Sequence, residues 1–505
     1  MKTIYKSLGI ALIACMAASC SDDFLTVTSP TQEDASEYFS TKAHLDEAVV
    51  AAYDPMHWTD WSMDQYEPFI LMSDIMADDM WVGGSDKNDN QNWHLMMNYE
   101  ATPMKVITAI WIDGFSGIKR CNDVFSYLEK EIEGATDTDI ASWKAQTYVL
   151  RAYYATWLWK FYGNVPYYQT NLSGDYISPQ ISADELYEYI VKDIEDALAL
   201  EALPWKGDAA TYGRVTTAMA YMLYTEVVMY QKDIERYPTA LAYMKEIIDS
   251  PEYSLAPDYA TIFEEAGEWC EESIFEINYI SENAARDWGA PLTAGGTVLP
   301  TLISPNNWPA GQDGHNTGWG FCPLRIETYE MFSPDDARRD ATCWDVRDYA
   351  DTYNKRYQDF GFFLQKYSAR ADGNAGQKAS GELNYNNNWR IYRYSEALLN
   401  AAELIATIGG NTGDARRYLN DVRHRAGLVT ELEPTIDNIL QERRLEFVGE
   451  GKRYWDLIRT DRAATTLLPD EYGYRTNAWT PNKKHLPIPQ SEIDRANGTL
   501  TQNPY

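Results

Sequence analysis

The sequence predicts a mostly α-helical protein, built from helical hairpins with two irregular, loop-rich stretches set into the scaffold. Several segments of about 15 to 20 residues carry apolar side chains at helical spacing and are bounded by capping residues. Short connections join them, as in hairpins of the tetratricopeptide type. The two irregular stretches are rich in Gly, Pro, Asn and Asp, which do not sustain regular helices.

The helices can be placed from their ends and their periodicity. Ser182 to Glu185 fits a capping box, and apolar side chains then recur every four residues as far as Leu198. Pro238 sits where it can open a helix. Because the tetratricopeptide consensus is poor, an irregular helical bundle stays the alternative arrangement. The predicted helices cover residues 143–161, 182–198, 216–230, 238–249, 395–408, 414–425 and 435–448.

Length and charge exclude some classes of protein. The chain has 505 residues, enough for a large core, and a formal net charge of −33. Nucleic acid is excluded as a partner because no cluster of Lys and Arg matches a phosphate backbone. The aromatic residues comprise 37 Tyr, 17 Trp and 14 Phe. Rings with a polar edge dominate, and these suit polar ligands as well as cores.

The N-terminus predicts export. Lys2 and Lys6 precede an apolar run over residues 8–18, which is too short to span a bilayer. Small residues then lead into Cys20, an arrangement that resembles the lipobox of bacterial lipoproteins, in which the cysteine carries acyl chains. Ordinary signal cleavage beside an incidental cysteine is the alternative. Residues 21–23 (SDD) resemble the export tag of Bacteroidetes lipoproteins that face outward from the outer membrane.

No cofactor is predicted. Residues 86–90 (DKNDN) begin like a calcium loop, but Gln91 and Met97 replace the Gly and Glu that an EF-hand needs. A looser Ca²⁺ site stays open. No C-x-x-C pair exists to hold zinc. The sequence does not decide between disulfides and free thiols for Cys121, Cys270, Cys322 and Cys343.

Catalysis is not predicted either. No zinc-protease or serine-hydrolase motif occurs, and the six histidines are scattered. With 76 acidic residues, carboxylate pairs at glycosidase spacing will arise by chance, so their presence decides nothing. A surface glycosidase is kept only as a competing hypothesis.

The C-terminal part carries a family resemblance. Residues 440–459 (LQERRLEFVGEGKRYWDLIR) strongly resemble the signature of the SusD/RagB family. Residues 393–403 (RYSEALLNAAE) and 419–427 (LNDVRHRAG) resemble its two preceding motifs. The ending, 485–494 (HLPIPQSEID) and 502–505 (QNPY), is similar to the family's close. The signature itself has a structural interpretation, because its charged residues pair at helical spacing and its apolar residues face a core.

The resemblance implies a domain plan. It divides the chain into a lipoprotein signal (1–19), an N-terminal helical region (20–280) that contains the loop stretch 57–102, a loop-rich insertion (281–390) and a signature region (391–505).

The resemblance also implies a function. It implies a non-catalytic, cell-surface lipoprotein of the outer membrane that binds oligosaccharides or polysaccharide. A SusC-like TonB-dependent transporter is implied as the partner that receives the glycan. Peptide or other nutrient binding is the alternative within the same family.

Glycan binding needs exposed rings and planar polar groups. A ring stacks on the apolar face of a sugar, and Asp or Asn bonds its hydroxyls; by analogy with stacked bases, each ring contributes up to ~1–3 kcal/mol. The two irregular stretches supply such residues, and the family's glycan sites draw on loops in these regions. For any single Trp, packing inside the loop is as good an explanation as ligand contact. The predicted glycan-binding residues are Asp79, Trp81, Asn88, Trp93, Trp288, Trp308 and Trp319.

Overall fold

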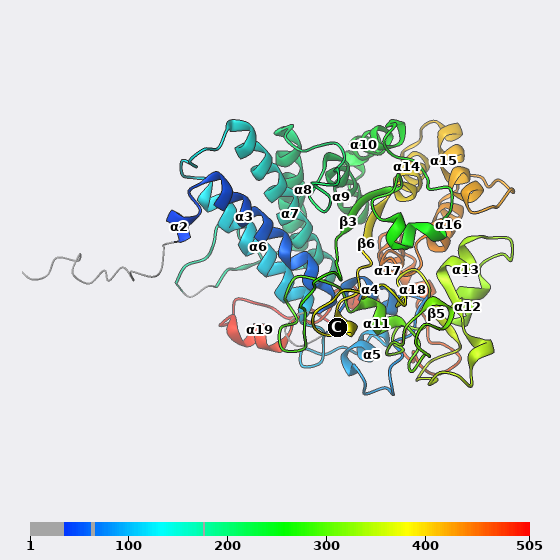
Figure 1. The fold of residues 1–505 in the computed structure, drawn as a ribbon. Coiled ribbons are helices and arrows are strands. Elements are labelled where there is room, and N and C mark those ends of the chain that lie inside the picture. The colour runs from blue at the N-terminus through cyan, green and yellow to red at the C-terminus, as the bar shows by residue number, and fades with distance from the viewer. Residues whose placement is uncertain (1–34, 62–65, 175–176) are drawn as a thin grey trace, which may run out of the picture.

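The protein has a helical scaffold on one side and a loop-rich region on the other (Figure 1). The computed structural model describes residues 35–61, 66–174 and 177–505. The predicted fold class, a mostly helical protein, is confirmed. The predicted signal at 1–19 and the lipidation site Cys20 lie outside the described residues.

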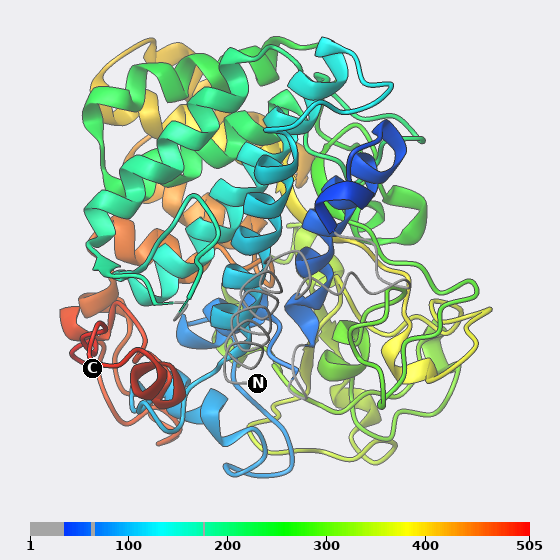
Figure 2. The ribbon, with the colours of Figure 1, turned by 90° about the vertical axis from the view of Figure 1, so that its left-hand side faces the viewer.

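The scaffold is a chain of helices in which successive members pack on each other. In the series α3, α6, α7, α8, α9, α10, α14, α15 and α16, each helix contacts the next one. Figure 2 shows these helices gathered away from the loop-rich region. Their bounds are α3 Lys42–Tyr53, α6 Ala109–Tyr127, α7 Asp137–Tyr162, α8 Ala183–Ala199, α9 Thr217–Gln231, α10 Tyr237–Asp249, α14 Tyr394–Ile408, α15 Thr412–Arg425 and α16 Ile436–Glu446.

Capping residues explain where these helices begin. Ser182 and Thr216 accept backbone N–H bonds at the starts of α8 and α9. Helix α7 begins six residues before the predicted start, because Thr136 forms a reciprocal capping box with Asp139. Helix α15 is capped by Asn411 and not by Asp414, so it also begins earlier than predicted.

Helix α6 was not predicted, and its glycines explain why. Gly114 and Gly117 lower helix propensity, so the segment does not read as a helix. In the structure both glycines face α7. A Cβ on Gly114 would lie 2.8 Å from Leu158, and one on Gly117 would lie 2.3 Å from Tyr154. Tertiary packing therefore selects residues that local propensity disfavours.

Short elements complete the structure. In the described residues the strands form three antiparallel pairs: β1 with β2 in the connection between α7 and α8, β3 with β6 where the second irregular stretch begins and ends, and β4 with β5 within that stretch. The strand bounds are β1 Val165–Pro166, β2 Gln180–Ile181, β3 Ser273–Ile277, β4 Cys343–Asp345, β5 Phe362–Leu364 and β6 Trp389–Arg393. The short helices are α2 Ala35–Tyr38, α4 Phe69–Met76, α5 Gln91–Met97, α11 Leu299–Ile303, α12 Ile326–Glu330, α13 Arg338–Thr342, α17 Arg453–Arg459, α18 Ala463–Thr466 and α19 Gln490–Arg495.

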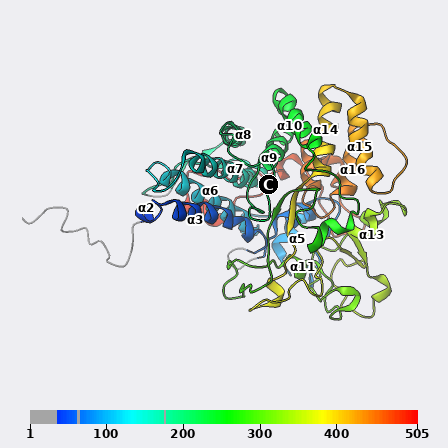
Figure 3. The same ribbon diagram turned by 45° about the horizontal axis from the view of Figure 1, so that its top comes forward.

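The second irregular stretch leaves and re-enters the scaffold at one place. Strand β3 pairs with β6, and Ile277 lies opposite Trp389. Residues 278–388 therefore start and end side by side, while α10 still packs on α14 across the interruption. Figure 3 shows this stretch projecting below the helices. The scaffold thus holds the stretch at its base and leaves its outer loops to meet solvent.

The signature motif forms a buried ion network that joins these parts. Arg393 at the end of β6 bonds Glu446 and Glu450 of the signature at 2.8–2.9 Å. Arg338 also pairs with Glu446 at 3.0 Å, and Arg425 contacts the same carboxylate. Breaking such a buried pair costs about 3–5 kcal/mol. The signature is therefore structural, as expected, but its glutamates pair with basic residues of distant segments and not at helical spacing within the motif.

The structure decides the state of the cysteines, which the sequence leaves open. The four described cysteines, Cys121, Cys270, Cys322 and Cys343, are free thiols. Within the described ranges, no helix combines the length and the apolar character that crossing a bilayer requires.

Candidate functional site

Two predicted site residues in the first irregular stretch belong to the core. Trp81 is completely buried, with the Arg325 guanidinium 3.7 Å from its ring centre and Tyr474 packed against its edge. Asp79 is buried as well and is paired with Arg444 at 2.7 Å. The expectation that these two side chains face solvent is wrong, because residues distant in sequence cover them.

Two more predicted rings are buried. Trp93 is 2% exposed and packs against Phe321. Trp308 is also 2% exposed; it forms a small separate core with Trp344, and its indole N–H donates to the Gln312 carbonyl at 3.0 Å. The expectation of exposure is wrong for both rings, since each supports a loop from within.

The remaining predicted residues are accessible. Trp288 is 45% exposed, Trp319 is partly buried and Asn88 is exposed. The Trp288 and Trp319 ring centres lie 5.7 Å apart with planes inclined by 29°. The two rings therefore stack on each other with tilted planes, and the exposed part of Trp288 remains open to solvent.

Tyr66 completes this exposed aromatic group. Its ring centre lies 5.3 Å from Trp319, and it also contacts Trp61, which lies beneath Trp288. We call Tyr66, Trp288 and Trp319 the aromatic platform. Tyr66 is not among the predicted glycan-binding residues, because nothing in its local sequence except its place in the first irregular stretch distinguishes it from the other tyrosines, which number 37 in all.

Backbone bonds to a short helix hold Trp319 in place. Its N–H donates to Thr301 O at 2.7 Å, and the N–H groups of Gly320 and Phe321 donate to the next carbonyls, Ser304 and Leu302. Gly318 allows this close approach, since a Cβ there would lie 2.5 Å from the Thr301 oxygen. Trp319 is therefore presented by the C-terminal end of α11.

A buried ion pair positions the loop that carries Trp288. Arg286 donates to both oxygens of Asp60 at 2.8 Å, and Asp60 also accepts from Val298 N–H at 2.7 Å. Burial by itself would lower the pKa of Arg286, but the Asp60 carboxylate raises it overall. Asp60 belongs to a 3₁₀ helix (Asp54–Asp60) that ends beside Trp61, so this ion pair holds the Trp288 loop next to the Trp61 ring that supports it.

Polar side chains border the platform. Asp89 accepts hydrogen bonds from Ser85 N–H at 2.8 Å and pairs with Arg356 at 3.1 Å, and the side chains of Asp89 and Arg356 are both partly exposed. Burial and the nearby Asp89 charge raise the pKa of the Tyr66 phenol, which keeps it a neutral hydrogen-bond donor. The platform thus combines apolar faces with groups that can bond hydroxyls.

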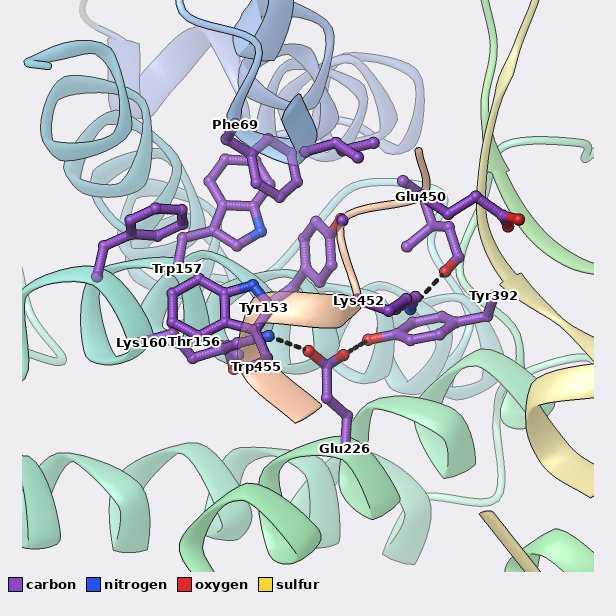
Figure 4. Close-up of a pocket in the computed structure, with 14 residues that line it drawn as sticks. Phe69, Tyr153, Thr156, Trp157, Lys160, Glu226, Tyr392, Glu450, Lys452 and Trp455 are labelled. Carbon is purple, nitrogen blue, oxygen red and sulfur yellow. Dashed lines mark hydrogen bonds and ion pairs between the residues drawn. The ribbon is translucent and has the colours of Figure 1, made fainter. Parts of the chain in front are cut away.

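A cavity lined by α4, α7, α9, β6 and the signature segment is too small to be the site. Figure 4 shows Lys160 and Tyr392 bonded to Glu226 in this cavity, whose volume is about 50 Å³. That volume holds a few water molecules, whereas ligand pockets begin at roughly 300 Å³. Despite burial, Lys160 and Lys452 lower the pKa of Glu226 to about 2, so the cavity carries a structural ion pair.

No metal centre emerges from the geometry. In the parts of the chain that the structure describes, no group of three or more His, Cys, Asp or Glu side chains is arranged to hold a metal ion. In the 86–90 loop, Asp86 accepts from Asn88 N–H at 2.7 Å, which explains the loop by hydrogen bonding.

Fold and site together define a binding protein with a rigid helical scaffold and an open aromatic surface on its loops. The chain belongs to the SusD family. The SusD family model matches residues 334–505, and a model described as "Starch-binding associating with outer membrane" matches residues 23–227. Proteins of this family bind glycans without breaking them, which confirms the expectation that the chain is not an enzyme.

Solved structures extend the similarity over nearly the whole chain. Surface glycan-binding protein A from Bacteroides thetaiotaomicron, in complex with laminarihexaose, is 60% identical; the match covers 92% of this chain and 100% of that one, with a TM-score of 0.89. The protein of the same name from Bacteroides uniformis is 48% identical over 92% and 100%, with a TM-score of 0.85. SusD-like protein P2 of Formosa agariphila is 24% identical over 92% of this chain and 93% of its own length.

Proposed function

We propose that this protein captures laminarin-type glucans on the aromatic platform and passes them to a SusC-like TonB-dependent transporter. Attachment to the outer membrane through a lipid on Cys20 is part of the proposal. The observation that carries it is the stacked pair of Trp288, which is 45% exposed, and Trp319, which is partly exposed, on loops that hydrogen bonds and an ion pair hold in place.

The inclination of the rings supports a curved glucan as ligand. The β-1,3 linkage of laminarihexaose turns each glucose relative to the next. Planes at 29° suit such a turning chain. The 60% identical relative solved with laminarihexaose supports the same substrate class.

The open geometry supports delivery rather than storage. A shallow platform covers only one side of a sugar chain, whereas tight ligand sites bury most of their ligand. A transporter that closes against the platform would cover the other side. Acyl chains on Cys20 would hold the protein at the membrane where such a partner sits.

Calorimetric titration with laminarihexaose tests the binding step. We expect Trp288→Ala and Trp319→Ala each to weaken binding about tenfold to a hundredfold, the effect of losing one stacked ring. The wild-type protein should bind one hexasaccharide.

Trp205→Ala is the matched control, because Trp205 is also a partly buried tryptophan but packs against Tyr253 in the helical scaffold. Its affinity for laminarihexaose should stay unchanged. Equal affinities for the wild type and both platform variants would overturn the site, and binding of peptides in place of any glucan would favour the alternative function.

A further inference from the structure

A second exposed aromatic surface lies near the platform. Four rings form it, Tyr357, Phe360, Tyr472 and Tyr474; Tyr472 is 36% exposed, and the other three are partly buried. Phe360 and Tyr472 have ring centres 4.8 Å apart, and Tyr474 lies 5.3 Å from Tyr357. We call this group the tyrosine surface. The glycan-binding residues predicted from sequence do not include it.

Buried residues fix these rings from below. Trp81 contacts Tyr472 and Tyr474 edge to face, and Arg325 lies against the ring of Trp81. Arg475 follows Tyr474 and donates to the Ala77 carbonyl at 2.6 Å, which ties the segment to the end of α4. The tyrosine surface is therefore preorganised, which reduces the entropy lost on binding.

Only one loop separates this surface from the platform. Tyr357 N–H donates to Gly84 O at 3.0 Å, so the tyrosine surface adjoins the loop 83–90. In α5, just after this loop, Trp93 contacts Tyr66 of the platform and the next residue, His94, contacts Tyr357. The two surfaces thus flank the same short segment.

Polar groups bridge the gap between them. The Asp89–Arg356 pair, at 3.1 Å and partly exposed, connects the two surroundings, because Asp89 lies close enough to Tyr66 to raise its pKa and Arg356 directly precedes Tyr357 in the chain. The phenol of Tyr472 donates to Glu327 at 3.2 Å at the far end. Rings alternating with carboxylate, guanidinium and phenol groups repeat the chemistry of the platform.

We propose that the tyrosine surface is a second contact site for the same glucan, engaged only by chains long enough to cross the loop 83–90 from the platform. This inference rests on the proposed function. A short oligosaccharide fills the platform alone, whereas a polymer adds the second contact at a high effective concentration.

Calorimetry with two ligands tests the inference. We expect Tyr472→Ala to bind laminarihexaose like the wild type but to bind laminarin polysaccharide about fivefold to twentyfold more weakly, as expected for one lost stacking contact. Tyr212→Ala is the matched control, because Tyr212 is also 36% exposed but stacks on Trp269 elsewhere. It should bind both ligands unchanged.

Hydrogen exchange on the wild-type protein gives a readout that needs no variant. Polysaccharide should protect amides in residues 470–475 and 355–360, and laminarihexaose should not. Protection by neither ligand, or unchanged polysaccharide affinity in Tyr472→Ala, would overturn the second contact while leaving the platform intact. Failure of the wild type to bind either ligand would overturn the proposed function and this inference together.

Discussion

The two irregular stretches have similar compositions but different places in the fold. Trp81 and Trp93 of the first stretch are buried, whereas Trp288 and Trp319 of the second reach the surface. Residues of the second stretch, such as Phe321 and Arg325, cover these two rings of the first. The buried tryptophans of the first stretch therefore support the fold, and the second supplies the two accessible indole rings to which we assign the ligand.

The largest expected effect contrasts one tryptophan from each stretch. Trp81→Ala should lower the free energy of unfolding by about 3–5 kcal/mol, because it removes a fully buried ring and leaves a cavity. Trp288→Ala should change it by less than about 1 kcal/mol, since that ring is half exposed. Denaturant titration of both variants measures the difference, and equal losses would abolish the distinction between the supporting and the accessible tryptophans.

A smaller effect concerns the Arg286–Asp60 ion pair, which links the two irregular stretches. Arg286→Lys keeps the positive charge but loses the two-pronged bond to Asp60. We expect a loss of about 2 kcal/mol in unfolding free energy and weaker binding of laminarihexaose, because the Trp288 loop is no longer fixed. Arg495→Lys, in an exposed pair with Glu492 at 2.7 Å, is the control and should change neither quantity measurably.

Glu67, next to Tyr66, allows a test by pH. Burial raises the pKa of Glu67 to about 7, even though the N–H groups of Thr108 and Ala109 donate to its carboxylate and lower it. In the unfolded chain the carboxyl titrates near 4.5, so the unfolded state releases its proton first as pH rises. The stability contributed by the protonated form is complete below pH 4.5 and is lost as pH approaches 7.

The effect can be isolated with one isosteric variant. Relative to Glu67→Gln, the wild type should lose roughly 2 kcal/mol of unfolding free energy between pH 5 and pH 7.5. Denaturant titrations of both proteins at the two pH values measure this difference. Parallel behaviour of the two proteins would mean that Glu67 titrates normally.

Local signals were sufficient for much of the scaffold. Helix α8 begins next to Ser182, as the capping pattern predicts, because the orphan N–H groups at a helix start bind residues adjacent in sequence. Helix α9 begins one residue after the predicted start, with Thr216 as its cap. Local signals did not predict α6, because its glycines lower helix propensity. Gly114 and Gly117 are needed for the close packing of α7 against α6, which only the tertiary structure shows.

For the site, the sequence by itself determined the family, the pair of loop stretches and a set of tryptophans that includes both indole rings of the platform. Only the tertiary structure decided which rings are open. The exposure of Trp81 depends on Arg325 and Tyr474, which lie hundreds of residues away, and loops carry no periodicity that reports such contacts. Tyr66 enters the site for the same reason: distant segments fold around it and leave its ring beside Trp319.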